Sequence, residues 1–177
     1  MLNIRKCDER NIAQIAKLSK EVLEDLERNG TSDLFGGVDE SEIADAMKFP
    51  STVIMAEDDN NKIIGFLLLQ KPSEEEEEEY KKEFPNSYKV GEGIIVNGIG
   101  VDPKFRKNGF ASRMLKFGKE YAIEHGFTKF IGTIHPNNDA SAGALSHIAK
   151  MEKGNPFIHK TRDGRDLLRQ YFIQKLV

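Results

Sequence analysis

The sequence predicts an α/β protein with one mixed, mostly antiparallel seven-stranded sheet and flanking helices. Seven short segments have alternating or continuous apolar residues, which is typical of strands. Between them lie segments whose apolar residues recur every three or four positions, as in amphipathic helices. The order is strand, two helices, three strands, helix, strand, helix and two strands. Hairpins in this order pair antiparallel, and the strand–helix–strand crossover adds one parallel pair.

The bulk composition narrows the class of protein. The chain has 177 residues, which predicts a single domain over residues 1–177. No apolar run approaches the roughly 20 residues that cross a bilayer, and the first ten residues lack the apolar core of a secretory signal. Cys7 is the sole cysteine, so a reducing compartment is the default. We therefore expect a soluble, cytoplasmic protein with no membrane partner.

The charges argue against two further classes. The net charge is −3 and the lysines and arginines are dispersed, whereas nucleic-acid binding needs clustered bases. The four histidines lack the spacing of metal ligands, so no metal site is expected: His125, His135, His147 and His159.

The N-terminal part of the chain predicts a strand and two helices. Residues 2–7 alternate between apolar and polar side chains, as a strand does. Asp8 suits the N-cap of the first helix, and Asn29–Gly30 suits its end. A second helix is expected over residues 40–48, ahead of Pro50.

The next part predicts a β-hairpin followed by an acidic insertion. Residues 52–57 and 63–70 are β-prone and flank a turn cluster. Residues 72–92 are polar and include six consecutive glutamates. Glu77–Lys81 and Glu78–Lys82 have the spacing of helical ion pairs, so we expect a solvated helix here.

The second half predicts a strand–helix–strand crossover. Residues 93–101 are rich in Ile, Val and Gly, and Asp102–Pro103 ends this strand. A loop leads into a helix that reaches about His125, and Gly126 suits its C-terminal turn. A second buried strand follows over residues 127–134.

The C-terminal part predicts a helix and a hairpin. The helix is expected over residues 138–151. Two strands follow, over residues 156–160 and 166–175. They flank Asp163–Gly164, and an Asp-Gly pair is a strong hairpin signal.

The segment Gly98–Arg113 carries the clearest chemical signal, because a strand, a polar loop and a helix follow one another. The first turn of a helix has unpaired N–H groups and the positive end of the helix dipole, which suits phosphate. Gly109 lets the backbone approach a ligand closely, and Arg106 and Lys107 add positive charge. Taken alone, this loop is also compatible with an ordinary structural turn.

The run Val101–Ala111 resembles the signature of the GNAT superfamily of N-acetyltransferases. Their loop pattern is Arg/Gln-x-x-Gly-x-Gly/Ala after an apolar strand that ends Val-x-Pro, and Arg106, Gly109 and Ala111 match it. The family's order of strands and helices also matches nearly the whole chain.

The resemblance implies the acyl-CoA N-acyltransferase fold, in which two central parallel strands splay apart and acetyl-CoA lies in the opening. Here these strands are residues 93–101 and 127–134, with the pantetheine arm against residues 99–101. The expected activity is transfer of an acetyl group from acetyl-CoA to a primary amine of a small molecule or peptide. The amine would attack directly in a ternary complex.

A second motif, His135-Pro-Asn-Asn-Asp-Ala-Ser141, resembles the family's segment that faces the pantetheine arm, although an Asn here is also an ordinary helix cap. The resemblance gives the following expected cofactor-binding residues: Ile99, Gly100, Val101, Arg106, Lys107, Asn108, Gly109, Phe110, Ala111, Ser112, Asn138 and Ser141.

The sequence departs from the family at the general base. A Glu is common near the position that Asn97 occupies, and an amide cannot accept the proton. Glu92, through a water molecule, and His135 are the candidate bases.

The usual acid, a Tyr seven residues after the motif Asn, is replaced by Leu145. Tyr171 or Tyr88 is the candidate acid. Because both proton carriers depart from the pattern, a catalytically inactive acyl-CoA-binding module of the same fold is the main alternative. A phosphate-binding interaction domain unrelated to acyl transfer is a third.

The acidic insertion lies on the side where acceptors enter in the family. One hypothesis is that Glu74–Glu79 covers the acceptor site and favours cationic amines, and the alternative is an acidic solvated surface. The resemblance also allows a homodimer through the terminal strands.

Overall fold

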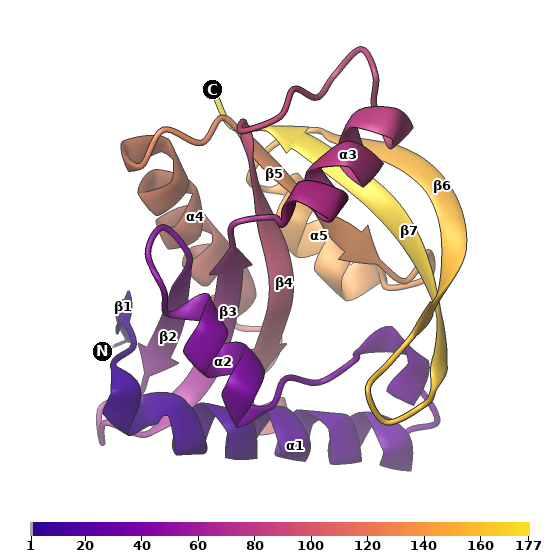
Figure 1. Cartoon of the computed structure of the whole chain (residues 1–177). Coiled ribbons are helices and arrows are strands. Elements are labelled where there is room, and N and C mark those ends of the chain that lie inside the picture. Colours follow the sequence, from indigo (N-terminus) through magenta and orange to yellow (C-terminus); the bar gives the residue numbers. More distant parts are fainter. Residues whose placement is uncertain (1) are drawn as a thin grey trace.

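One seven-stranded sheet with the strand order β1-β2-β3-β4-β5-β7-β6 organises the computed structural model, which describes residues 2–177 (Figure 1). The strands are β1 (Asn3–Lys6), β2 (Thr52–Glu57), β3 (Ile63–Gln70), β4 (Gly93–Val101), β5 (Lys129–Ile134), β6 (Met151–Lys160) and β7 (Asp166–Lys175). The β4–β5 pair is parallel, and the other neighbours pair antiparallel. The predicted mixed, mostly antiparallel sheet is confirmed.

The helices lie on both faces of this sheet (Figure 1). They are α1 (Ile12–Arg28), α2 (Glu40–Ala46), α3 (Glu74–Glu83), α4 (Phe110–Glu124) and α5 (Asp139–Ser146), with short 3-10 turns η1 (Glu9–Asn11), η2 (Ser32–Leu34) and η3 (Pro103–Phe105). No helix within residues 2–177 is both long and apolar enough to cross a membrane.

Helices α1 and α2 cover one face of the sheet because their apolar stripes meet its buried side chains. Ile15 and Ile43 are fully buried there against Phe66 of β3. The Asp8 carboxylate caps η1, which leads into α1, and Gly30 follows the helix with φ 71°. The predicted end of the first helix is therefore confirmed, whereas the predicted cap, Asp8, caps the 3-10 turn that leads into α1 rather than α1 itself, whose N-cap position is Asn11.

Helices α4 and α5 cover the opposite face. Met114, Leu115 and Ala122 of α4 are buried against β2 and β3, and Leu145 of α5 joins the same cluster. Gly126 follows α4 with φ 85°, in agreement with the predicted C-terminal turn.

Helix α3 is not a fully solvated helix, so that prediction is wrong for one of its faces. Tyr80 is buried in a third cluster, which includes Ile131 of β5. Glu77 is buried as well, and its carboxylate accepts a 2.5 Å hydrogen bond from the Tyr88 hydroxyl and a 3.2 Å bond from the Gly91 N–H. The Glu77 side chain therefore points into the protein, on the same side of α3 as Tyr80, which packs against the sheet.

The parallel strands β4 and β5 part halfway along. They pair from Gly93↔Lys129 to Val96↔Gly132 and no further. Beyond Val96, β4 continues beside β3, with a register shift at Asn97, while β5 continues against β7 to Ile134. The splayed pair implied by the resemblance is therefore present. We call the paired half of β4 and β5 the closed end and the parted half the open end.

The predicted helix over residues 138–151 is too long. Helix α5 ends at Ser146, and β6 begins at Met151. The side-chain amide of Gln174 on β7 donates to the carbonyls of Leu145 and Ala149 at 2.8 and 2.7 Å, which satisfies the helix end. Pairing with β7 therefore outweighs the local helical preference.

Candidate active site

The chain leaves the open end of β4 through a turn fixed by Asp102. This buried carboxylate accepts the Lys104 N–H at 2.9 Å and the Lys62 ammonium at 3.0 Å. Burial alone would raise the pKa of Asp102, but these two donors outweigh burial and hold the pKa below its ordinary value. The start of the loop is therefore fixed.

The loop itself turns through two left-handed residues. Lys107 has φ 62° and Gly109 has φ 74°. The Asn108 amide donates to the carbonyls of Phe105 and Arg106 at 3.1 and 3.2 Å, so it holds the loop together. A Cβ built on Gly109 would meet no atom within 4 Å, so this side of the loop is open.

The N-terminus of α4 lacks a side-chain cap within residues 2–177. Helix α1 also lacks a side-chain cap of its own, but it continues directly from η1, which Asp8 caps. Asp39, Ser73 and Asn138 cap α2, α3 and α5. The first backbone N–H groups of α4, from Phe110 onward, are therefore left for another partner. With the positive end of the helix dipole behind them, they suit a phosphate group.

Arg106 is bound to α1 rather than free. Its guanidinium donates to the Asp25 carboxylate at 2.7 Å. Its positive charge is thus partly balanced, while Lys107 is exposed. Arg106 therefore contributes less positive charge to the loop than predicted, and it links the loop to α1.

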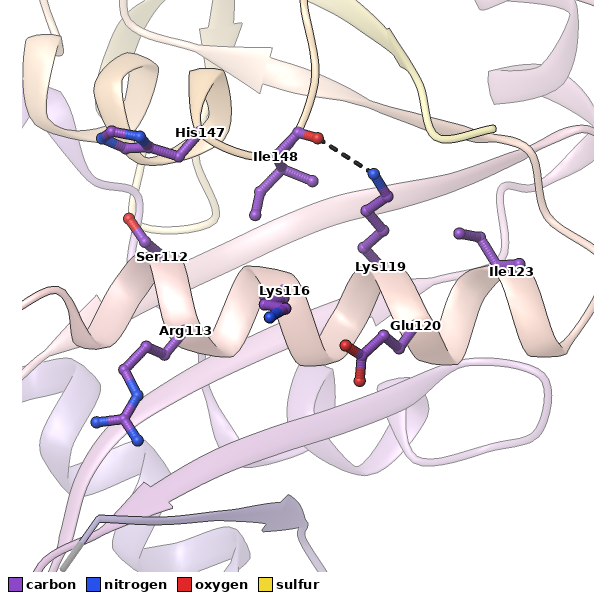
Figure 2. A pocket seen from close by; sticks show the side chains of 8 residues that line it. All are labelled: Ser112, Arg113, Lys116, Lys119, Glu120, Ile123, His147 and Ile148. Carbon is purple, nitrogen blue, oxygen red and sulfur yellow. Dashed lines mark hydrogen bonds between the residues drawn. The ribbon is translucent and has the colours of Figure 1, made fainter.

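A groove of about 400 Å³ runs along α4, starting at its first turn (Figure 2). Its lining residues are Ser112, Arg113, Lys116, Lys119, Glu120, Ile123, His147 and Ile148. Lys119 donates to the Ile148 carbonyl at 3.3 Å. The lining has three basic side chains and one acidic side chain, so the groove is positively charged. The groove was not predicted, although bases at positions 113, 116 and 119 share one side of a helix and were visible in the sequence.

Asn138 and Ser141 form the cap of α5. The Asn138 side-chain oxygen accepts the Ser141 N–H at 3.1 Å, and its amide nitrogen donates to the Leu34 carbonyl at 3.3 Å. The capping alternative is therefore confirmed. Asn138 also ties η2 to this edge of the sheet.

His135, a candidate base, is buried directly after β5. Its Nδ1 accepts the Asn137 N–H at 3.0 Å, so the neutral ring carries its proton on Nε2. Nε2 lies 3.1 Å from the Asp33 carboxylate. Both nitrogens are engaged, and His135 would have to release one partner before it accepts a proton.

Glu92, the other candidate base, immediately precedes the closed end of β4. Its carboxylate accepts the Lys89 N–H at 3.3 Å. The strands part four residues later, at Val96, which is roughly 13 Å away at about 3.3 Å per residue. The structure therefore does not bring Glu92 to the parting point.

Of the two candidate acids, Tyr171 lies opposite Thr133 near the open end of β5. Burial, together with the carboxylates of Glu79 and Glu83, raises the pKa of its phenol, so the phenol keeps its proton at neutral pH. Tyr88 instead donates to Glu77 in the core beneath α3.

A model of the acetyltransferase (GNAT) family matches residues 18–146. The chain belongs to this family. No curated protein matches the chain in sequence.

Solved structures support the family fold over almost the whole chain. An N-acetyltransferase from Staphylococcus aureus Mu50 has a TM-score of 0.72 and 15% identity, and the match covers 100% of this GNAT chain and 99% of that one. The ribosomal-protein-S18-alanine N-acetyltransferase from Escherichia coli has a TM-score of 0.71 and 12% identity, over 99% and 94%. A GNAT phosphinothricin acetyltransferase from Sinorhizobium meliloti, in complex with AcCoA, has a TM-score of 0.69 and 15% identity, over 99% and 88%.

Proposed function

We propose that this GNAT protein transfers an acetyl group from acetyl-CoA to a primary amine by direct attack in a ternary complex. The observation that carries the proposal is an uncapped helix N-terminus at the open end of two parted parallel strands. The structural neighbours named above are acetyltransferases, one of them in complex with AcCoA, which supports the same donor here.

The proposed binding of acetyl-CoA uses backbone groups first. The N–H groups that begin α4 face the diphosphate, with Gly109 leaving room for it. The basic groove along α4 takes the phosphorylated nucleotide end. The edge of β4 at Ile99–Val101, freed from β5, offers backbone groups to the amides of the pantetheine arm.

The proposed chemistry needs two proton transfers. The ammonium form of the acceptor loses a proton to water or to His135, and the free amine attacks the thioester carbonyl. A backbone N–H on the open part of β4 stabilises the developing oxyanion. The thiolate leaves as the carbonyl re-forms, and Tyr171 donates the proton that converts it to a thiol. Holding both substrates in line contributes the remainder of the rate acceleration.

The test compares acetyl-CoA with acetyl-pantetheine, which lacks the nucleotide and its phosphates. We expect acetyl-CoA to raise the melting temperature, and thiol release to follow when amines are added. Arg113→Ala/Lys116→Ala should raise the KM for acetyl-CoA and leave that for acetyl-pantetheine unchanged. Failure of acetyl-CoA to bind would overturn the proposal.

The acyl-CoA-binding module without catalysis is the second candidate. It is favoured by Asn97 in place of a carboxylate and by the two engaged nitrogens of His135. Binding of acetyl-CoA without thiol release, across a panel of primary amines, would establish this alternative instead.

A further inference from the structure

Arg169 of β7 is a buried cation without a partner. The residue is only 9% exposed, and within residues 2–177 no hydrogen bond or ion pair reaches its guanidinium. The other two arginines of the β6–β7 hairpin are engaged. Arg162 binds the Asp39 carboxylate at 2.7 Å, and Arg165 binds Asp163 at 2.9 Å and two loop carbonyls.

A buried guanidinium is costly unless an anion balances it. Burial, and secondarily Arg165, lower the pKa of Arg169, while Asp33 opposes them. Arginine nevertheless remains protonated at neutral pH. Asp33 is already held by His135 at 3.1 Å. The protein therefore holds a positive charge in place with no carboxylate bound directly to it within residues 2–177.

Arg169 lies at the open end of the sheet. It lies one residue beyond the last β5–β7 pair, Ile134↔Gln170. Leu167 and Tyr171, two residues before and after it, share its face of β7. This is the face covered by α1, α2 and α3 (Figure 1).

The loop of residues 35–38 crosses the open end on this face, from β7 to β4. A Cβ built on Gly36 would lie 3.9 Å from Nη2 of Arg169, so Arg169 sits under the β7 end of the loop. At the other end, a Cβ on Gly98 of β4 would lie 3.1 Å from Val38. The Val38 N–H donates to the Ser19 hydroxyl at 2.8 Å, which fixes the loop.

We propose that Arg169 binds a carboxylate of the acceptor, so that the acceptors are amines that also carry a carboxylate, as amino acids do. The guanidinium fork matches a carboxylate in two parallel hydrogen bonds. This inference rests on the proposed function and names its substrate class.

The surroundings of Tyr171 suit the other end of such an acceptor. Tyr171 lies two residues from Arg169 on the same face, about 7 Å along the strand. The carboxylates of Glu79 and Glu83 influence its phenol, so negative charge lies where an ammonium group would arrive. An acceptor with both charges fits this pair of environments better than a polyamine does.

The experiment uses matched pairs of acceptors, namely the common amino acids and the amines that their decarboxylation gives. Thiol release is measured with the wild type, Arg169→Gln and Arg169→Lys. Arg162→Gln is the control, since Arg162 is an exposed arginine of the same hairpin. We expect the best amino acid to exceed its decarboxylated partner in kcat/KM by about 10- to 100-fold. Arg169→Gln should abolish this preference, Arg169→Lys should keep part of it, and Arg162→Gln should keep all of it.

Thermal unfolding provides a second readout that does not require turnover. Arg169→Gln should fold with an unchanged or higher melting temperature, because it removes an unbalanced buried charge. Amino acids, added with coenzyme A, should raise the melting temperature of the wild type and of Arg162→Gln but not of Arg169→Gln.

The outcomes separate the two proposals. Transfer to amines with no preference for a carboxylate, or with a preference that Arg169→Gln retains, overturns the role of Arg169 and leaves acetyl transfer standing. If no amine is acetylated, acetyl transfer fails and the thermal shifts decide. A shift that only Arg169→Gln loses supports carboxylate binding, and the absence of any shift in the wild type overturns it.

Discussion

Two glycines at opposite ends of α4 allow the role of one residue in binding to be separated from its role in folding. Gly109 and Gly126 have φ 74° and 85°, and a Cβ on either would meet no atom within 4 Å. Alanine at either position should therefore lower the free energy of unfolding similarly, by about 1–2 kcal/mol of backbone strain.

Only Gly109→Ala should also weaken acetyl-CoA binding, by about 10-fold, because the added methyl group lies where the diphosphate approaches the backbone. Chemical denaturation and titration calorimetry measure the two effects. Equal affinities for the two variants would contradict the assignment of the phosphate site.

Cys7 should behave as an inert thiol. It directly follows β1, and burial, together with the Asp8 carboxylate, raises the pKa of the thiol to about 11. Because the thiolate is the reactive form, the native protein should react with an aromatic disulfide reagent at pH 8 far more slowly than the denatured protein. A rapid stoichiometric reaction in the native state would show that Cys7 is accessible and ionised.

At the scale of elements, the turn that joins β4 to α4 should contribute a pH-dependent part of the stability. The pKa of Asp102 is lower in the folded protein than the ordinary value of about 3.9. Its contribution is therefore fully present above that value and is lost as the pH falls below it and the carboxyl is protonated.

Asp102→Asn should lower the free energy of unfolding at pH 7 by about 1–3 kcal/mol, because it removes the charge that Lys62 and the Lys104 N–H bind. The difference from the wild type should shrink in acid. Denaturation curves at pH 7 and pH 3 check this, and a constant difference would mean that the Asp102 charge is not responsible.

The buried side chains beneath α3 should contribute to stability rather than to cofactor binding. Tyr88→Phe removes the donor that satisfies the buried Glu77 carboxylate, which should cost about 1–3 kcal/mol of stability. Tyr80→Phe, in the same cluster, is the matched control and should have a smaller effect. Neither should change acetyl-CoA affinity, since α3 and α4 lie on opposite faces of the sheet (Figure 1). A loss of affinity in Tyr88→Phe alone would link α3 to the cofactor.

Local patterns predicted the elements whose signal lies within a few residues. The helix period gave α1, and the Asp-Gly pair marked the turn between β6 and β7. The end of α5 was missed because Met151 becomes a strand residue only through its pairing with Gln174 of β7. The inward turn of Glu77 was missed for the same kind of reason, since its partner Tyr88 lies beyond the helix.

The candidate site likewise has features that a local sequence motif predicted and features that depend on distant parts of the chain. The loop around Gly109 is a continuous motif and was predicted from the sequence. The pairing of Arg106 with Asp25 joins residues 81 positions apart, and no local pattern indicates it. The burial of Arg169 depends on a loop from the other half of the chain, so it became visible only in the folded protein.

At the scale of the whole molecule, the sheet should exchange hydrogens unevenly. Residues 93–96 of β4 pair with both neighbouring strands, whereas residues 97–101 lie beyond the last pair with β5. The amides of residues 97–101 should therefore exchange faster in the free protein. Acetyl-CoA should slow their exchange and leave that of residues 93–96 nearly unchanged. Hydrogen-exchange mass spectrometry that found no difference between the two segments would contradict pantetheine pairing along β4.

The parting of β4 and β5 has a consequence for how such a protein can change. The half of the sheet where the two strands stay paired holds buried, closely packed side chains, so substitutions there should lower stability. The proposed acceptor side is bordered by a short loop and a hairpin, which Arg165 joins through hydrogen bonds to the carbonyls of Ser32 and Gly36. If the proposed sites are right, exchanging residues on these two segments should change the acceptor while leaving the proposed donor site and the framework of the sheet unaltered.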